Sequence, residues 1–299
     1  MTGDDLAGTI AWRELRIEAR DALAAAGIGP ADQESWWLVE EASGMDRTEL
    51  VVGLEQPATV GGVARLDAMV ARRCAGEPVQ YVLGHWPFRS LDLLVDRRVL
   101  IPRPETEQVA EAALAALDEV LADRPAGHRG LAVDLGTGSG ALALAIAAER
   151  PGTEVWATER SAGAVEVARA NLAGLGMAGS RVRVVAGSWF EPLPEELAGT
   201  VDLVVSNPPY IGTAEPVARS VVDWEPADAL FAGPAGLAAY EAIVPAARRW
   251  LAPGGALVLE LGAGQADDVA ALADRAGFGD VRVVADLAGL DRALVARRT

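Results

Sequence analysis

The fold of this chain is set by the stretch Leu131-Ala132-Val133-Asp134-Leu135-Gly136-Thr137-Gly138-Ser139-Gly140. Its first half has the apolar pattern of a buried strand, and a helical pattern begins directly behind it, near Ala141. The three alternate glycines between them permit positive φ and a close approach of a ligand to the backbone. A helix N-terminus also presents free N–H groups and a positive dipole end, which suit a carboxylate or a phosphate. The stretch therefore predicts a ligand-binding turn, although a strand-to-helix turn can also exist without a ligand.

Short apolar strands alternate with helical patterns from Leu131 onward. The expected strands are Leu131–Asp134, Glu154–Glu159, Val182–Ala186, Val201–Ser206, Ala256–Leu261, Val281–Asp286 and Arg292–Ala296. The expected helices are Ala141–Glu149, Ala162–Leu175, Leu237–Leu251 and Ala266–Ala276. This alternation predicts a doubly wound, mostly parallel sheet, in which ligands bind beyond the carboxyl ends of the strands.

The part of the chain before this sheet is organised differently. From Thr9 to about Cys74 the period is helical, which predicts a small helical domain over residues 1–75. Its exposed apolar residues can belong to a core or to a docking face. Residues 76–103 read as a linker, because Tyr81–Val95 alternates apolar and polar residues as a hairpin does. Pro104 then begins a helix that runs to about Asp123, so the α/β domain spans residues 104–299.

Cysteine, histidine and hydropathy exclude several classes of protein. The single cysteine, Cys74, rules out an internal disulfide, and His85 and His128 have no paired metal-ligand spacing, so we expect no metal. The longest apolar run, Ala141–Ala148, is too short to cross a bilayer, and Met1–Asp5 has no basic leader. We therefore expect a cytoplasmic monomer that makes no contact with membranes.

The formal net charge of -17 also limits the partners. A strongly acidic surface repels a phosphate backbone, because nucleic-acid binding depends on Lys and Arg neutralising phosphates. We expect no direct nucleic-acid binding. The acidity can simply keep the protein soluble, or it can attract a basic protein partner.

Glu159 ends the strand after the glycine turn, where a carboxylate can accept hydrogen bonds from two ribose hydroxyls. This position fits an adenosine-containing ligand but does not separate S-adenosylmethionine from NAD, since both present a ribose there. Asp134 favours the sulfonium cofactor, because a carboxylate there can lie near its amino group or order the turn. Trp189, in the segment Ala186–Phe190, can lie against adenine or can belong to the core.

The segment Ser206-Asn207-Pro208-Pro209-Tyr210 follows the strand Val201–Ser206 at the same sheet edge. Two consecutive prolines fix φ and force an extended, stiff loop. Such a loop can direct the Asn207 side-chain oxygen and the Pro208 carbonyl at the two hydrogens of an NH2 group, while Tyr210 covers the planar group. An amide nitrogen is a poor nucleophile, and two acceptors that orient it supply what methyl transfer needs. An ordinary proline turn is the alternative.

These residues resemble the HemK/PrmC family, which methylates the glutamine side chain in the Gly-Gly-Gln motif of peptide chain release factors. Besides the glycine turn and the Asn207–Tyr210 loop, the resemblance covers Gly76–Gly84, Val99–Glu107, Glu225-Pro226 with Ala229, Leu230 and Gly233, and Leu259–Gly262 with Gln265. It implies a class I S-adenosylmethionine-dependent methyltransferase, with a seven-stranded sheet behind a helical domain that binds the release factor.

The resemblance also implies roles for individual residues. The residues implied to contact S-adenosylmethionine are Gly136, Thr137, Gly138, Ser139, Gly140, Glu159 and Asn207, to which we add Trp189. Those implied to bind the glutamine are Asn207, Pro208, Pro209 and Tyr210, of which Asn207, Pro208 and Tyr210 are the expected catalytic residues. Many relatives have Asp at the position of Glu159, and either carboxylate can chelate a ribose.

Three other functions remain open from the residues themselves. A nucleic-acid methyltransferase acting on an adenine N6 or guanine N2 amino group can use the same loop, but its substrate conflicts with the acidic charge. A NAD-dependent oxidoreductase shares the sheet and glycines but does not need the Asn-Pro-Pro-Tyr loop. A docking module without catalysis can keep the fold and bind a basic protein.

Overall fold

The chain forms two compact units, and the boundary between them lies between His85 and Trp86. The computed structural model describes residues 10–286 and 288–299, so the predictions made for Met1–Asp5 and for Thr9 lie outside the described residues. The division falls within the segment 76–103 that the sequence assigns to a linker.

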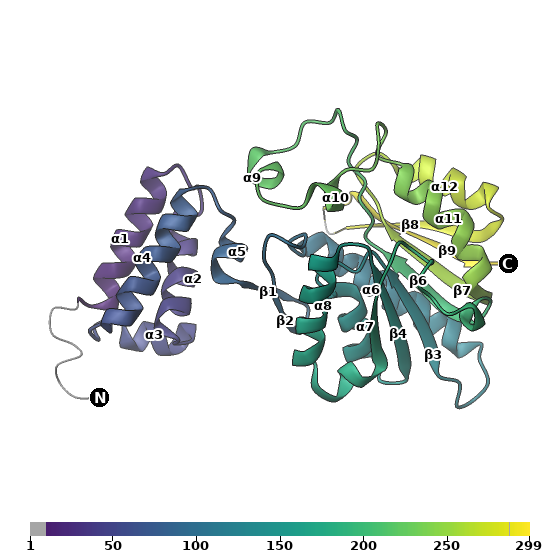
Figure 1. The fold of residues 1–299 in the computed structure, drawn as a ribbon, viewed down its shortest axis with the longest axis horizontal. Helices are drawn as coiled ribbons and strands as arrows, with labels where there is room; N and C mark the ends of the chain where they lie inside the picture. The colour runs from purple at the N-terminus through teal and green to yellow at the C-terminus, as the bar shows by residue number, and fades with distance from the viewer. Residues whose placement is uncertain (1–9, 287) are drawn as a thin grey trace. The chain divides into compact units, whose positions relative to one another are not determined.

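The first unit consists of helices within residues 10–85 (Figure 1). They are α1 (Trp12–Ala25), α2 (Ala31–Ser43), α3 (Arg47–Gly53), α4 (Val60–Cys74) and α5 (Val79–Leu83). Leu23 and Leu38, which follow the helical period of the sequence, are fully buried in one cluster between these helices. Helix α3 begins with a capping box, in which Asp46 accepts from backbone N–H groups while Glu49 accepts from the Asp46 N–H.

The hairpin is shorter than the alternation of the sequence predicts. Strands β1 (His85–Phe88) and β2 (Leu91–Leu94) pair with each other, whereas Tyr81–Leu83 belong to helix α5. Gly84 ends this helix at a φ of 84°, a left-handed conformation that glycine adopts without a Cβ penalty. Val82 packs into the core of the helical unit, so the burial of one helical face favours a helix over a strand in this segment.

The second unit is a seven-stranded sheet covered by helices, in the strand order β5-β4-β3-β6-β7-β9-β8. Its strands are β3 (Gly130–Leu135), β4 (Thr153–Glu159), β5 (Val182–Ala186), β6 (Val201–Ser206), β7 (Leu251–Glu260), β8 (Phe278–Ala285) and β9 (Asp291–Arg298). Its α-helices are α6 (Pro104–Ala122), α7 (Ala141–Glu149), α8 (Ala162–Gly174), α9 (Arg219–Val222), α10 (Ala227–Leu230), α11 (Ala238–Trp250) and α12 (Ala266–Arg275). Two 3-10 helices, η2 (Gly176–Arg181) and η3 (Glu195–Leu197), complete the described elements.

The prediction of a doubly wound, mostly parallel sheet is confirmed. All neighbouring strands from β5 to β7 pair in parallel, and β9 runs antiparallel between β7 and β8. The chain moves outward from β3 through β4 to β5 and then returns to place β6 on the other side of β3. This reversal of strand order is where open α/β sheets bind ligands.

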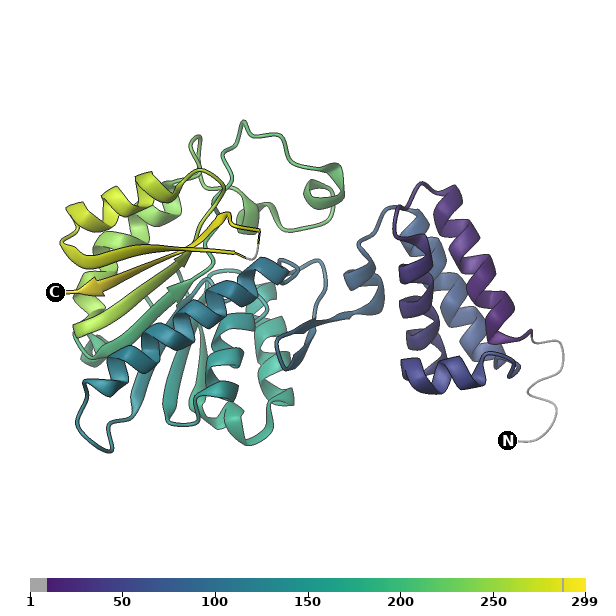
Figure 2. The ribbon, with the colours of Figure 1, turned by 180° about the vertical axis from the view of Figure 1, so that it is seen from behind.

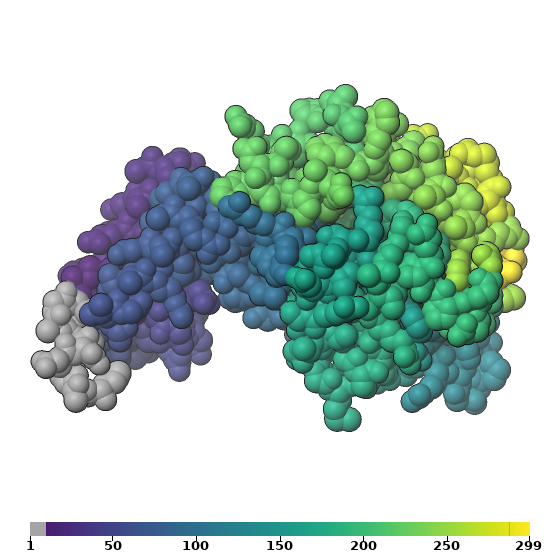
Figure 3. All heavy atoms as spheres, in the orientation of Figure 1, coloured from purple at the N-terminus to yellow at the C-terminus, as the bar shows by residue number. Residues whose placement is uncertain are grey.

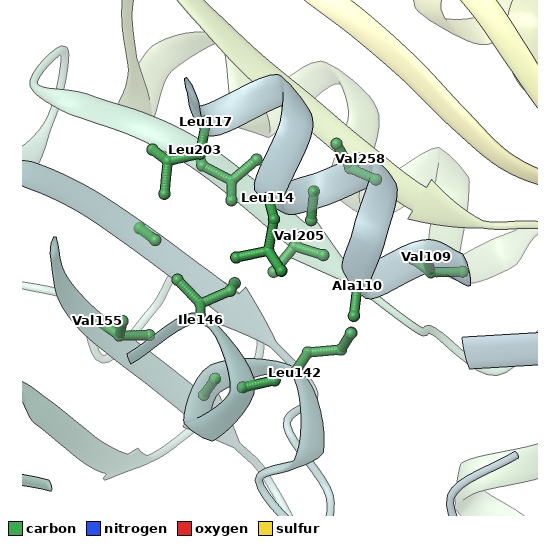
Figure 4. Packing of buried hydrophobic residues seen from close by; sticks show 14 of the residues in the cluster. Val109, Ala110, Leu114, Leu117, Leu142, Ile146, Val155, Leu203, Val205 and Val258 are labelled. Carbon is green, nitrogen blue, oxygen red and sulfur yellow. The ribbon is translucent and has the colours of Figure 1, made fainter. Parts of the chain in front are cut away.

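The sheet has a buried cluster on each face, because successive strand residues point to opposite sides. Leu203 and Val205 of β6 join the cluster that contains α6 and α7, and Val204 joins the one that contains α11 and α12. Helix α6 crosses one face of the sheet (Figure 2). Its Leu114 and Leu117 point into the first cluster, near Leu203 and Val205 (Figure 4).

None of the helices in the described parts of the chain is both long enough and apolar enough to cross a membrane.

The buried face of α6 gives a first prediction. Leu114 is 1% exposed in this cluster, so Leu114→Ala removes buried methyl groups and leaves a cavity, at a cost of about 2–5 kcal/mol in the free energy of unfolding. Leu290→Ala is the matched control, because Leu290 is 58% exposed and its truncation should cost less than about 0.5 kcal/mol. Urea unfolding of the full chain followed by circular dichroism measures both. Equal losses in the two variants would contradict the assigned packing.

Candidate active site

The carboxyl ends of three neighbouring strands bring the predicted site segments together. Strand β3 pairs in parallel with β4 on one side and with β6 on the other. These strands end at Leu135, Glu159 and Ser206, and the Ser206 hydroxyl donates to the Leu135 carbonyl at 2.6 Å. The glycine turn, Glu159 and the Asn207–Tyr210 loop therefore begin at one edge of the sheet.

The glycine turn requires glycine for two physical reasons. Gly136, Gly138 and Gly140 have φ values of 68°, 57° and 90°, in the region that side chains with a Cβ rarely adopt. A Cβ on Gly136 would also lie 3.3 Å from the ring of Trp189. The turn therefore brings its backbone against an aromatic ring at one end and leaves open space at Gly138, where a Cβ would meet nothing within 4 Å.

Asp134 is buried beneath this turn. Its Oδ2 accepts from the Thr137 hydroxyl at 2.5 Å and from the Ala143 N–H at 3.1 Å, which joins the strand to the turn and to α7. Its Oδ1 is buried and has no hydrogen-bond partner within residues 10–286 and 288–299. Burial raises the pKa of Asp134 to about 7. A buried carboxylate oxygen without a donor indicates a place for a donor from a ligand, since such groups are otherwise satisfied.

Glu159 holds the outer side of the turn. Its Oε2 accepts from the Gly138 N–H at 3.0 Å, and its Oε1 accepts from the Ser161 N–H at 2.8 Å. Each carboxylate oxygen can accept more than one hydrogen bond, so capacity remains for further donors. The contact with ribose hydroxyls stays a prediction, and the structure adds a second role, which is to fix the glycine turn.

A cavity of about 640 Å³ lies at this edge of the sheet. The predicted residues that line it are Gly136, Thr137, Gly138, Ser139, Glu159, Trp189, Asn207 and Pro209. The predicted residues that do not are Gly140, Pro208 and Tyr210. Gly140 lies behind the turn as the N-cap of α7, where a Cβ would meet Leu144 at 3.1 Å. The segment 226–233 forms another wall, and residues in this part of the chain are green in the space-filling view (Figure 3).

Trp189 lies both at the cavity and against the core, and its contact with adenine stays a prediction. It lines the cavity, and it packs against the buried cluster beside α11 and α12. Its φ of 46° is uncommon for an aromatic residue and is sustained by the packing around it. The ring therefore forms a fixed wall of the cavity next to Gly136.

Asn207 is anchored to two buried groups, Thr106, which lines the cavity, and Glu260, which lies outside its lining. Its Nδ2 donates to the Thr106 hydroxyl at 3.3 Å, and that hydroxyl donates to Glu260 Oε2 at 2.7 Å. Glu260 ends β7 and is 1% exposed. Burial raises its pKa to about 7. Within the described residues no hydrogen bond engages Asn207 Oδ1 or the Pro208 carbonyl.

Tyr210 is joined to the same buried acid. Its hydroxyl lies 3.4 Å from Glu260 Oε1, and its backbone carbonyl accepts from Gln265 Nε2 at 2.9 Å. Burial, followed by the charge of Glu260, raises the pKa of Tyr210 to about 12. The hydroxyl therefore stays protonated and directed at Glu260, and only the ring remains for covering a substrate, which stays a prediction.

Four residues of the site were given no role by the sequence analysis: Thr106, Glu260, Asn171 and Glu225. The Asn171 Oδ1 accepts from the Leu94 N–H at 2.7 Å, and its Nδ2 donates to the carbonyls of Leu94 and Ser139 at 3.1 and 2.8 Å. Asn171 therefore connects strand β2 to the glycine turn. Buried Glu225 accepts from the Ile101 N–H at 3.1 Å and pairs with Arg103. The sequence did contain a signal for Glu260, because it is a charged residue within an apolar strand, and charged residues are rarely buried unless they are paired.

Comparisons with known proteins give a consistent result. A family model described as the PrmC N-terminal domain matches residues 14–84, and one described as the methyltransferase small domain matches residues 109–223. The chain is 41% identical to a release factor glutamine methyltransferase of Geobacter sulfurreducens, over 95% of this chain and 96% of the relative. It is 44% identical to one of Burkholderia pseudomallei, over 86% of this chain and 88% of the relative. Among solved structures, the hMettl16 catalytic domain in complex with the MAT2A 3′UTR hairpin 6 has a TM-score of 0.52 at 14% identity, over 80% of this chain and 82% of that chain, and shows the same fold.

The contact between Gly136 and Trp189 gives a second prediction. Gly136→Ala forces a side chain into a positive φ and against the Trp189 ring, so the cavity wall must shift. We expect the dissociation constant for S-adenosylmethionine to rise by about tenfold or more, which is about 1.4 kcal/mol. Gly127→Ala is the matched control, because Gly127 has a φ of 85° but open space around its Cβ and lies outside the cavity lining. Isothermal titration calorimetry of both variants decides, and equal affinities would refute the constraint at Gly136.

Proposed function

We propose that this chain, which belongs to the family of release factor glutamine methyltransferases, methylates the side-chain amide nitrogen (N5) of the Gly-Gly-Gln glutamine in peptide chain release factors and so modulates translation termination. The methyl donor is S-adenosylmethionine, and the fold is that of a class I methyltransferase. The observation that carries the proposal is the position of the Asn207–Tyr210 loop beside the glycine turn, with Asn207 lining the same cavity.

The residues around the cavity fit S-adenosylmethionine. A volume of about 640 Å³ is within the range of cofactor sites, roughly 300–1,000 Å³. Asp134 offers a buried oxygen that accepts from no donor among the described residues, which suits an amino group, and Glu159 has acceptor capacity for ribose hydroxyls. Trp189 offers an apolar wall. When bound, S-adenosylmethionine supplies a methyl group that its sulfonium makes electrophilic.

The residues of the loop would orient the nitrogen that accepts this group. Asn207 Oδ1 and the Pro208 carbonyl are acceptors that are not engaged by the described residues, and an amide NH2 offers two donors. Accepting both hydrogens holds the plane of the amide and draws electron density onto its nitrogen, which compensates for the delocalised lone pair. The nitrogen would form one bond to the methyl carbon as the carbon–sulfur bond of the sulfonium breaks and leaves a neutral thioether. It would then release one proton to water, so the product is a neutral secondary amide.

We also propose that the helical unit binds the release factor. The support is its match to the PrmC N-terminal domain and a set of apolar side chains that it exposes. Val51, Val52 and Val60 are 54%, 81% and 62% exposed, and Val52 lines a shallow hollow with Met45. Exposed apolar side chains of this kind are typical of protein contact surfaces.

A competition assay tests the function and gives a third prediction. The chain is incubated with labelled S-adenosylmethionine, a release factor, ribosomal RNA and DNA, and mass spectrometry locates the label. We expect one methyl group on the Gly-Gly-Gln glutamine. Asn207→Ala should lower kcat by about 100- to 1,000-fold, the scale of removing one oriented contact in the transition state, while release-factor affinity changes little. Label that enters only nucleic acid would support a nucleic-acid methyltransferase instead, and an active Asn207→Ala would refute the role of Asn207.

The helical unit gives a fourth prediction. Val52→Asp places a charge on the exposed apolar side chain and should raise the KM for the release factor by about tenfold with little change in kcat. Met177→Asp is the matched control, because Met177 is 90% exposed and belongs to the sheet unit. Steady-state kinetics with varied release factor measure the effect. An unchanged KM in Val52→Asp would remove Val52 from the binding surface.

A further inference from the structure

A chain of three hydrogen-bonding groups runs from the cavity into the core of the sheet unit. It begins at the Asn207 amide, passes through the Thr106 hydroxyl and ends at the Glu260 carboxylate, with distances of 3.3 and 2.7 Å. Thr106 and Glu260 are 4% and 1% exposed, and of these two buried residues Thr106 also lines the cavity. The proposed reaction uses only the outer member of this chain.

Counting protons fixes the direction of these hydrogen bonds. A hydroxyl has one proton, and an ionised carboxylate can only accept. Thr106 must therefore give its proton to Glu260, as the short 2.7 Å distance indicates, and toward Asn207 it can only accept. The side of the Asn207 amide that faces Thr106 is consequently the NH2, and the oxygen is the atom left for the cavity.

We propose that Thr106 and Glu260 are positioning residues, which fix the Asn207 side chain with its NH2 group toward Thr106 and its Oδ1 free to accept from the substrate amide. This inference rests on the proposed function of Asn207. The proposed orientation of Asn207 requires that Thr106 donates its proton to Glu260, so it depends on the ionisation state of Glu260.

Protonation of Glu260 reverses the direction. A neutral Glu260 can donate to Thr106, whose own proton then turns toward Asn207 and pairs with the amide oxygen instead of the NH2 group. Burial raises the pKa of Glu260 to about 7, and neighbouring groups shift this pKa in both directions. Arg292 on β9 and the hydroxyls of Thr106 and Tyr210 favour the ionised form, while Glu105 on α6 disfavours it. Tyr240 on α11 donates to the Glu260 carbonyl at 2.9 Å.

The composition of the chain offers a direct probe. The sequence contains two asparagines, Asn171 and Asn207, so protein labelled with 15N at asparagine side chains shows two NH2 pairs in an NMR spectrum. We expect the Asn207 pair to shift between pH 5 and 9 with a midpoint near the Glu260 value of about 7. The Asn171 pair, bound to Leu94 and Ser139, is the internal control and should not follow that titration. Asn207→Ala assigns the two pairs.

Three variants separate positioning from packing. Thr106→Val keeps the volume but removes the hydroxyl, Thr106→Ser keeps the hydroxyl but removes the methyl group, and Glu260→Gln removes the titration. We expect the Asn207 titration to vanish in Thr106→Val and Glu260→Gln and to persist in Thr106→Ser. In methyl transfer, Thr106→Val should lower kcat by about 100-fold, the scale of a misplaced reacting group, and Thr106→Ser should restore it to within about threefold of the wild type.

The pH profile is the last readout. Wild-type kcat should fall as the pH drops below about 7, because protonated Glu260 releases Asn207 Oδ1 to Thr106. Burial also raises the pKa of Asp134 to about 7. A decline in kcat caused by Asp134 would persist in Glu260→Gln, whereas a decline caused by Glu260 would disappear. If Thr106→Val lowers the melting temperature, the Asn207 titration and the pH profile of Glu260→Gln decide instead.

Two results overturn the inference. One is an Asn207 signal that titrates in Glu260→Gln as in the wild type, and the other is a Thr106→Ser that loses as much activity as Thr106→Val. The first result does not depend on the substrate, since the NMR titration needs no methyl transfer. A wild-type chain that does not methylate glutamine while its Asn207 signal titrates as expected would refute the proposed function and leave the hydrogen-bond direction standing.

Discussion

The parallel pairing of β3 with β6 is the constraint on which the site depends. It places Asp134 opposite Val205, and the Ser206 hydroxyl then closes the ends of the two strands by donating to the Leu135 carbonyl. The glycine turn leaves one strand and the Asn207–Tyr210 loop leaves the other, so a shift of one residue in register would invert every side chain of β6. The buried alternation of Leu203, Val204 and Val205 opposes that shift, because one inversion would exchange the contents of both clusters.

Two buried carboxylates, Asp134 and Glu159, line the cavity of this strongly acidic chain, and a third, Glu260, lies behind Asn207. Asp134 ends up beneath the glycine turn, Glu159 beside it, and Glu260 behind Asn207. Burial of a charged carboxylate costs free energy unless donors compensate it, and each of the three is held by backbone N–H or hydroxyl groups rather than by a close ion pair. The pKa values of Asp134 and Glu260 are raised to about 7 as a result. A cationic ligand is the group that such a surrounding favours, and S-adenosylmethionine carries its positive charge on sulfur and on its amino group.

The sequence predicts the parts of this site that local patterns encode. Alternate glycines after an apolar strand and two prolines after Asn207 each restrict the backbone within a few residues, so the turn and the loop could be located. The contact of Thr106 with Glu260 joins residues 154 positions apart, and no local pattern determines such a pair. The same holds for the insertion of β9 between β7 and β8, which depends on packing of the last hairpin against the sheet. The prediction of a strand at Tyr81–Leu83 was wrong, because burial of Val82 on a helical face outweighs a short alternation of apolar and polar residues.

The loop geometry alone does not choose the substrate, and the choice lies in what surrounds it. An amide and a base amino group both offer two N–H donors in a plane, so Asn207 Oδ1 and the Pro208 carbonyl can receive either. A base in nucleic acid brings phosphates with it, and these would approach a chain with a net charge of -17. A protein loop brings no phosphates, and in the proposed function the helical unit, which exposes Val52, supplies further contacts to it. In the proposed reaction, catalysis would therefore reside at the sheet edge, where Asn207 Oδ1 and the Pro208 carbonyl, which no described residue engages, would orient the nitrogen. Specificity for a protein substrate would come from the negative charge of the chain and from contacts outside the cavity.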